Sequence, residues 1–174
     1  MTTKPIFLCG FMAVGKSSVG KLLASHLQKD FVDSDEWIEQ TVKKPIFQIF
    51  KESGETGFRE LEAKALKEFS GRENCVVALG GGALGSSQNS ELIRISGILV
   101  YLSADVESLL LRLSTSSQRR PMLENLDNKS RRLRVIELLK LREADYAVAD
   151  IKVDTELKSP QTLVFEICEF LEQY

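Results

Sequence analysis

The sequence contains few cysteines and no long apolar segment. Its three cysteines, Cys9, Cys75 and Cys168, are odd in number and far apart, and the first two lie in or beside apolar runs. We therefore expect buried, reduced thiols and neither a disulfide framework nor a cysteine metal site. There is neither an apolar signal-like segment near residue 1 nor an apolar run of membrane-spanning length, so we expect a cytoplasmic protein.

An excess of one sign of charge is also lacking. Lys and Arg together number 23, Asp and Glu number 25, and the formal net charge is −2. Such a chain has no broad electrostatic field to attract a nucleic acid or an anionic membrane. We therefore expect small-molecule partners, with no nucleic acid and no membrane. The single histidine, His26, is expected to be structural, and Trp37 either packs in a core or lines a pocket.

A phosphate-binding loop is the most informative feature that the sequence does contain. Residues 10–17, GFMAVGKS, fit the pattern G-x-x-x-x-G-K-[ST] and follow the apolar run 6–9. In such a loop the glycines let backbone N–H groups converge on a polyphosphate, Lys16 reaches the outer phosphates and Ser17 can ligate Mg²⁺. The apolar residues that follow have helical spacing, and a helix N-terminus here would favour an anion. A glycine-rich turn alone would not explain the Lys and Ser, so we predict nucleotide binding.

Short β-rich apolar runs alternate with longer segments of helical period, which is typical of a parallel sheet covered on both faces. A chain of 174 residues that is 43% hydrophobic suits one globular domain. Two connections, about 35–74 and 114–128, exceed what a simple crossover needs, and such excess is where acceptor pockets and lids are built. We expect five strands, at 6–9, 31–33, 76–79, 97–102 and 149–153, and helices that begin near residues 16, 36, 56, 88, 105, 129 and 160. In the helix near 129, Leu133 is expected to join a core stripe.

Two acidic residues, Asp33 and Asp35, stand in alternate positions at the end of the second predicted strand. If strand geometry persists that far, their side chains point the same way. One carboxylate could then hold a metal-bound water while the other meets a substrate hydroxyl. The alternative is that Ser34 or Asp35 simply caps the next helix.

Two further motifs follow. Arg59 and Glu62 share one face of a predicted helix, and an arginine held by a carboxylate presents its remaining donors to an anion. The alternative is an exposed ion pair that contributes little. Gly80-Gly81-Gly82 follows an apolar strand and permits close approach of a ligand, although it could also be a loose turn.

Taken in order, these motifs resemble the shikimate kinases, small P-loop kinases related to the nucleoside monophosphate kinases. Two further segments share the resemblance: residues 119–123, RRPML, are similar to the family's lid, and residues 141–150, which include Arg142, Tyr146 and Asp150, are similar to its last substrate-binding helix. The family phosphorylates the 3-hydroxyl of shikimate from ATP, a step of the chorismate pathway to aromatic amino acids. The resemblance implies a single-domain α/β P-loop kinase over residues 1–174, with a five-stranded parallel sheet flanked by helices. It further implies an acceptor-binding helical insert at about 35–62, a mobile lid at about 114–124, and a monomer.

The resemblance also assigns roles to residues. Lys16, Asp35 and Arg120 are the expected catalytic residues: Lys16 contacts the transferring phosphate, Asp35 holds the acceptor hydroxyls, and Arg120 closes over the site from the lid. Mg²⁺ is expected at Ser17, with Asp33 in its outer shell. ATP is expected at Gly10, Ala13, Val14, Gly15, Lys16, Ser17, Ser18, Arg112 and Arg120. Shikimate is expected at Asp35, Gly80, Gly81 and Gly82, with Arg59 and Arg142 clamping its carboxylate and Glu62 orienting the clamp.

The sequence allows alternatives for several of these roles. Asp35 could act as a base or only position the hydroxyl. Ala13 stands where family members often have glycine, which alters the freedom of the loop. Arg112 is the best candidate to stack on adenine, and we choose Arg120 over Arg119 because it directly precedes Pro121. A kinase for another small acceptor such as gluconate, and a nucleotide-sensing module without turnover, are the alternative functions.

Overall fold

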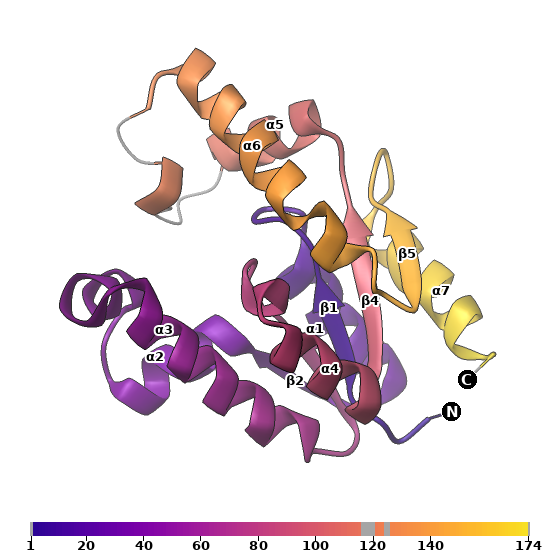
Figure 1. Cartoon of the computed structure of the whole chain (residues 1–174). Helices are drawn as coiled ribbons and strands as arrows, with labels where there is room; N and C mark the ends of the chain where they lie inside the picture. The colour runs from indigo at the N-terminus through magenta and orange to yellow at the C-terminus, as the bar shows by residue number, and fades with distance from the viewer. Residues whose placement is uncertain (1, 116–120, 124–125, 174) are drawn as a thin grey trace.

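A computed structural model describes residues 2–115, 121–123 and 126–173. Its centre is one five-stranded sheet in the order β2-β3-β1-β4-β5, in which every pair of neighbouring strands is parallel (Figure 1). The strands are β1 Ile6–Cys9, β2 Asp30–Asp33, β3 Cys75–Ala78, β4 Ile98–Ser103 and β5 Ile151–Asp154. The predicted α/β class is confirmed, and the predicted strand ends are correct to within two residues.

Helices connect the strands. They are α1 Lys16–Leu27, α2 Ser34–Val42, α3 Ile46–Ser70, α4 Ser87–Ser96, α5 Val106–Thr115, α6 Asn128–Tyr146 and α7 Pro160–Leu171, with 3₁₀ turns η1 Ala83–Gly85 and η2 Pro121–Leu123. Local chemistry explains where α7 begins: Ser159 caps the helix by accepting from Thr162 N, and Pro160 occupies its first turn.

The helix predicted to begin near residue 56 corresponds to the second half of α3, whereas the first half, which begins at Ile46, was not predicted. Helix α3 begins at Ile46 and is broken at Gly54, whose backbone is not helical (φ 66°, ψ −171°). Because the backbone is not helical at Gly54, the second half begins where the sequence pattern predicted a helix. The break turns the chain within the segment predicted to bind the acceptor.

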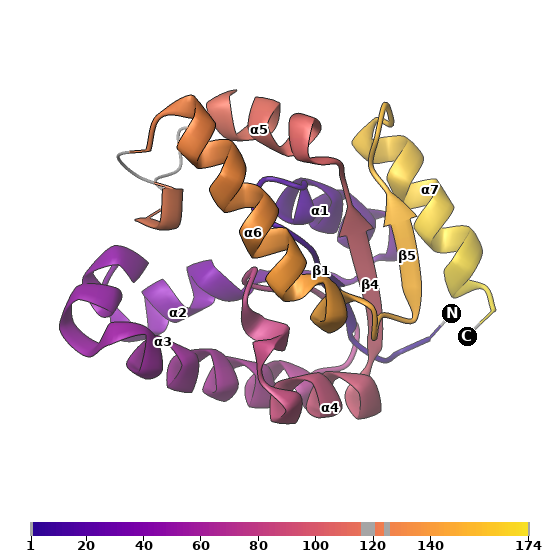
Figure 2. The same cartoon turned by 45° about the horizontal axis from the view of Figure 1, so that its top comes forward.

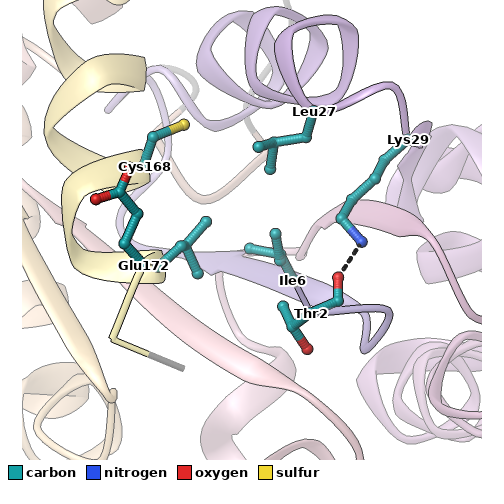
Figure 3. Close-up of a pocket in the computed structure, with 7 residues that line it drawn as sticks. Thr2, Ile6, Leu27, Lys29, Cys168 and Glu172 are labelled. Atoms are coloured by element: carbon teal, nitrogen blue, oxygen red, sulfur yellow. Dashed lines mark hydrogen bonds between the residues drawn. The ribbon is translucent and has the colours of Figure 1, made fainter.

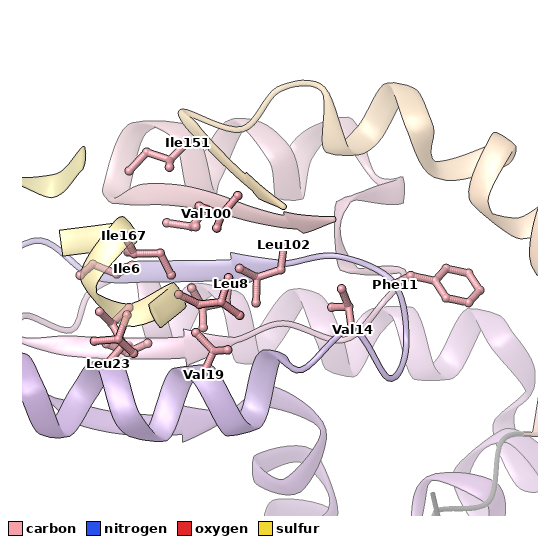
Figure 4. Packing of buried hydrophobic residues seen from close by; sticks show 14 of the residues in the cluster. Ile6, Leu8, Phe11, Val14, Val19, Leu23, Val100, Leu102, Ile151 and Ile167 are labelled. Carbon is pink, nitrogen blue, oxygen red and sulfur yellow. The ribbon is translucent and has the colours of Figure 1, made fainter. Parts of the chain in front are cut away.

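The sheet separates two apolar layers, because neighbouring residues of a strand face opposite sides. Ile6 and Leu8 of β1 face α1 and α7, where Val19, Leu23 and Ile167 pack on them (Figure 4). Phe7 and Cys9 face the other layer, which α2, α3 and α4 cover. Helices α3 and α4 contact each other on that side, and α5 packs against α6 (Figure 2). Burial of both faces is what a parallel sheet requires.

Trp37 and His26 make aromatic contacts, whereas Leu133 does not reach the core. Trp37 packs edge to face against Phe69, with ring centroids 5.3 Å apart, and His26 contacts Phe165 between α1 and α7. Leu133 is 58% exposed, so the prediction that it joins a core stripe was wrong. The buried positions of α6 are Val135 and Leu138, one helical turn apart, and Tyr146 at its end.

The cysteines lie within this architecture as free thiols, Cys9 and Cys75 buried and Cys168 half-buried. In the described part of the chain, none of the helices combines the length and the apolar character needed to cross a membrane.

Candidate active site

The phosphate-binding loop lies between β1 and α1, at the carboxyl edge of the sheet. Gly10 and Gly15 have φ values of 139° and 111°, which glycine adopts without strain. Ala13 has φ 62°, a left-handed conformation that costs an L-residue about 1–2 kcal/mol. The Lys16 ammonium donates to the carbonyls of Gly10 (2.9 Å) and Phe11 (3.0 Å). The lysine therefore lies against the loop, at the N-terminus of α1.

Asp33 links this loop to the end of β2. The Ser17 hydroxyl donates to Asp33 Oδ2 at 2.6 Å. The other oxygen, Oδ1, accepts from the backbone N–H groups of Asp35 (3.1 Å) and Glu36 (3.4 Å) and so caps α2. One carboxylate thus serves both the helix and the loop hydroxyl.

The structure corrects the two interpretations of the acid pair. Strand β2 ends at Asp33 and α2 begins at Ser34, so strand alternation does not orient Asp35. The residue that caps the helix is Asp33, whereas Ser34 Oγ accepts from Gly80 N at 2.8 Å. Asp33 and Asp35 nevertheless line the same cleft.

This first cleft has a volume of about 540 Å³. The loop, the ends of β2 and β3, and α5 supply its walls, with residues that include Ala13, Gly15, Lys16, Ser17, Ser18, Asp33, Asp35, Gly81 and Arg112. Most of the ATP-binding and metal-binding residues expected from the sequence therefore share one cavity.

Arg112 is fixed at the wall of this cleft by three hydrogen bonds. Its guanidinium donates to the Val14 carbonyl (3.1 Å), to Thr155 Oγ1 (2.9 Å) and to the Thr155 carbonyl (3.1 Å). Thr155 follows β5 and is buried. The arginine thereby joins the phosphate loop to the segment after β5, a connection that sequence reasoning did not predict.

The triple glycine is where the remaining candidates meet. A β-carbon on Gly80 would lie 2.8 Å from both Asp35 Oδ1 and Glu62 Oε1. On Gly81 it would lie 3.0 Å from Arg142 Nη1, and on Gly82 only 2.6 Å from the Arg59 guanidinium. A side chain at any of these positions would therefore push the ends of the neighbouring acidic or arginine side chains out of place. The segment is therefore a close-packed floor rather than a loose turn.

Glu62 shows that the Arg59 pair is not an exposed one. The Glu62 side chain is 2% exposed and that of Arg59 is 35% exposed, and Arg59 Nη1 donates to Glu62 Oε2. Arg59 Nη2 donates to Glu55 Oε1 at 2.9 Å. Burial raises the pKa of Glu62, although the charges of Arg59 and Arg142 oppose the rise. A carboxylate is therefore kept in the interior to hold an arginine at the surface of the site.

A second cleft, of about 630 Å³, lies beyond the glycines. Arg59, Gly82 and Arg142 line it, together with residues of α3, α4 and α6. Gly81 lines the first cleft and Gly82 the second, so the two adjoin at the triple-glycine loop. Arg142 extends past the Phe11 ring, with 5.7 Å from guanidinium carbon to ring centroid.

Arg120, predicted to act from the lid, falls outside the described residues, as do Arg119 and most of the lid segment. Asp150, included in the resemblance to a substrate-binding helix, lies at the opposite edge of the sheet, where its carboxylate accepts from Leu99 N at 2.8 Å. It supports the start of β5 and not the site.

Another hollow, between α1, α7 and the start of β1, has the wrong size for a substrate (Figure 3). Its volume is about 20 Å³, which accommodates about one water molecule. Lys29 Nζ donates to the Thr2 carbonyl across its rim at 2.8 Å, and Ile6 and Cys168 line it. Because Ile6 starts β1, this hollow lies at the end of the sheet away from the phosphate loop.

Comparison with known proteins agrees with this geometry. The family model described as "Shikimate kinase" matches residues 12–172. A shikimate kinase of Chlorobium chlorochromatii is 41% identical over 97% of this chain and 91% of its own length. Among solved structures, a shikimate kinase of Bacteroides thetaiotaomicron has a TM-score of 0.93 and 34% identity, covering 97% of this chain and 98% of the other. A shikimate kinase of Acinetobacter baumannii, solved in complex with shikimate, has a TM-score of 0.91 and 35% identity, and the match covers 99% of this chain and 94% of the other. The chain therefore belongs to the shikimate kinase family.

Proposed function

We propose that ATP occupies the first cleft and shikimate the second, with the phosphoryl group passing between them beside the triple-glycine loop. The reaction is that of the family, the ATP-dependent phosphorylation of shikimate at its 3-hydroxyl. The observation that carries the allocation is the convergence of Asp35, Arg59 and Arg142 on three glycines that also border the phosphate-loop cleft.

The nucleotide end supplies charge neutralisation. Phosphoryl transfer depends on positioning and on stabilising negative charge more than on covalent participation by the protein. Lys16, already directed at the loop by two backbone carbonyls, is the cation for the transferring phosphate. Arg112, held beside the loop, presents a planar guanidinium to the adenine end. We assign Arg120 to close over the phosphates from the lid.

The residues present suit Mg²⁺ brought by the nucleotide. Ser17 Oγ and Asp33 Oδ2, 2.6 Å apart, are the hard oxygen donors that this ion prefers. Nowhere in the described ranges do three or more His, Cys, Asp or Glu side chains gather into a metal-binding cluster. Ser17 would therefore hold the ion directly and Asp33 would hold one of its waters. The ion, when bound, would neutralise charge on the phosphate oxygens.

The acceptor end recognises an acid with neighbouring hydroxyls. Two guanidinium groups, from Arg59 and Arg142, border the second cleft and suit a carboxylate. Among the described residues Arg142 Nη1 is buried without a hydrogen-bond partner, as expected of a donor reserved for a ligand. Asp35, in the first cleft, is placed to accept from an acceptor hydroxyl. Both clefts are built from one chain, which supports a monomer. Because the reaction consumes ATP, which is available in the cytoplasm, a cytoplasmic location is the one we propose.

The test is ADP release from purified protein with Mg-ATP in three parallel reactions, with shikimate, with gluconate and with no acceptor. Release that depends on shikimate alone is the expected result. Release with gluconate instead would overturn the acceptor assignment. Silence in all three, despite tight ATP binding, would favour a nucleotide-sensing module.

A further inference from the structure

Two buried side chains hold the backbone of the triple-glycine loop from different helices. Ser34, the first residue of α2, accepts at Oγ from Gly80 N at 2.8 Å. Tyr146, the last residue of α6, donates from its hydroxyl to the Gly81 carbonyl at 3.1 Å. The two side chains belong to residues that are 4% and 3% exposed. Hydrogen bonds from two helices thus reach two consecutive residues of the loop.

Glycines cannot fix their own backbone direction, because they lack a β-carbon and have access to most conformations. Farther along, the turn orders itself, since Ala83 N donates to Gly80 O and Gly85 N to Gly82 O, both at 3.1 Å. In the described part of the chain, Ser34 is the hydrogen-bond partner of Gly80 N and Tyr146 that of Gly81 O. The direction in which the loop presents its groups to a ligand therefore depends on two hydroxyls.

Tyr146 is itself held in place. Its ring stacks on Tyr101 with centroids 4.8 Å apart and planes inclined by 21°. It follows Arg142 by one helical turn, so the arginine and the loop contact share one rigid segment of α6. Burial raises the pKa of Tyr146, although the nearby Arg142 opposes the rise, and the phenol stays protonated as a donor.

We propose that Ser34 and Tyr146 are positioning residues for the acceptor: by fixing the backbone of Gly80 and Gly81, they orient the loop and set the affinity for shikimate. The inference rests on the proposed function, in which shikimate binds against this loop. Neither hydroxyl needs to touch the substrate.

The test compares Ser34→Ala and Tyr146→Phe with the unmodified enzyme. Loss of one hydrogen bond should raise the KM for shikimate roughly three- to tenfold, while the KM for ATP changes little. Ser34→Thr, which keeps the hydroxyl, should restore the low KM. In the double variant, the fold-increase in the KM for shikimate should be smaller than the product of the fold-increases in the two single variants, because both hydroxyls hold the same loop.

Matched controls remove similar groups elsewhere. Tyr101→Phe removes the hydroxyl of the stacking neighbour and leaves the Gly81 contact in place. Ser96→Ala removes a hydroxyl that donates to the Leu92 carbonyl near the end of α4. Both should keep the original KM for shikimate.

The outcomes separate the inference from the function on which it rests. An unchanged KM for shikimate in Ser34→Ala and Tyr146→Phe, while Arg59→Ala raises it, would overturn the positioning role and leave the function standing. Equal rises in both KM values together with a lower melting temperature would also overturn it, because they would indicate general loosening. If Arg59→Ala also leaves the KM for shikimate unchanged, the proposed acceptor site itself is wrong.

Discussion

Replacement of Arg59 by alanine distinguishes a substrate clamp from ordinary ion pairing on a helix. The chain offers a matched control, because Arg94 pairs with Glu91 in α4 at the same separation of three residues. The side chains of that pair are 61% and 58% exposed, whereas Glu62, the partner of Arg59, is 2% exposed. Because the spacing is the same in both pairs, a difference between Arg59→Ala and Arg94→Ala in stability or in substrate affinity reflects the burial and position of the arginine.

The expected magnitude follows from the contacts that Arg59→Ala removes. A hydrogen bond to a charged group contributes about 1.5–3 kcal/mol, which corresponds to a rise of roughly ten- to hundredfold in the KM for shikimate. Leaving a buried carboxylate without its partner costs about 3–5 kcal/mol. Because Arg59 is 35% exposed and Arg142 also acts on Glu62, we expect a smaller loss of stability, about 1–3 kcal/mol.

The loss of stability should depend on pH. Burial already raises the pKa of Glu62 and Arg59 opposes the rise, so removing Arg59 raises this pKa further. A carboxyl with a raised native pKa binds more protons in the folded than in the unfolded protein. Stability therefore falls as the pH rises from the ordinary glutamate value of 4.5 through the native pKa. The deficit of Arg59→Ala should be smaller at about pH 5 than at about pH 8.

Steady-state kinetics with each substrate varied, and urea unfolding at the two pH values, measure these effects. We expect the KM for ATP to stay nearly unchanged in Arg59→Ala, and we expect Arg94→Ala to change stability little, because an exposed ion pair contributes little. Equal losses of affinity for shikimate and ATP would refute the clamp. An Arg94→Ala variant that behaves like Arg59→Ala would refute the argument from burial.

Substitutions at Lys16, Asp33 and Ala13 test the nucleotide end, with Lys21→Ala as a control. Lys16→Ala should reduce turnover with any acceptor by about 10²–10³-fold, whereas Lys21→Ala in the same helix should not, and near-normal turnover in the first would remove the phosphate-loop assignment. Asp33→Asn keeps an acceptor for the cap of α2 and should raise the Mg²⁺ concentration needed for activity at nearly constant stability. Asp33→Ala should in addition lower the free energy of unfolding by about 0.5–2 kcal/mol. If urea unfolding gives Asp33→Asn and Asp33→Ala the same stability, the capping role of Asp33 is wrong. Ala13→Gly should leave the free energy of unfolding unchanged or raise it by up to about 1 kcal/mol, because relief of the left-handed strain exceeds the entropy cost of glycine. A clear loss of stability in this variant would show that Ala13 is unstrained.

The sequence predicted a structural feature correctly wherever the residues that determine the feature lie close together along the chain. The phosphate loop, its preceding strand and its following helix lie within residues 6–27, and their pattern predicted all three. Strand positions followed from short apolar runs, and the start of α7 followed from Ser159 and Pro160. Each of these features depends on interactions that span a few residues.

Features that depend on distant contacts could not be predicted in this way. Ser34 looked like a helix cap, but its hydrogen-bond partner is Gly80, 46 residues away. Arg112 was chosen for adenine stacking without any sign that Thr155 would fix it from 43 residues away. The spacing of Arg59 and Glu62 was equally consistent with an exposed pair, because periodicity does not show which helix face a third segment covers. Asp33 and Asp35 do share a cleft, although the strand geometry used to expect this does not extend to Asp35.

Several features that cost folding free energy gather at the carboxyl edge of the sheet. Ala13 adopts a left-handed backbone, Glu62 keeps a carboxylate in the interior, and within the described chain Glu62 Oε1 and Arg142 Nη1 are buried without hydrogen-bond partners. A sequence optimised for stability alone would avoid such features. Their position beside the phosphate loop and the triple glycine agrees with a site whose polar groups are completed by substrate. Because a ligand that binds only the folded state stabilises it, ATP and shikimate would offset part of this cost, so that the enzyme is most stable when both clefts are filled.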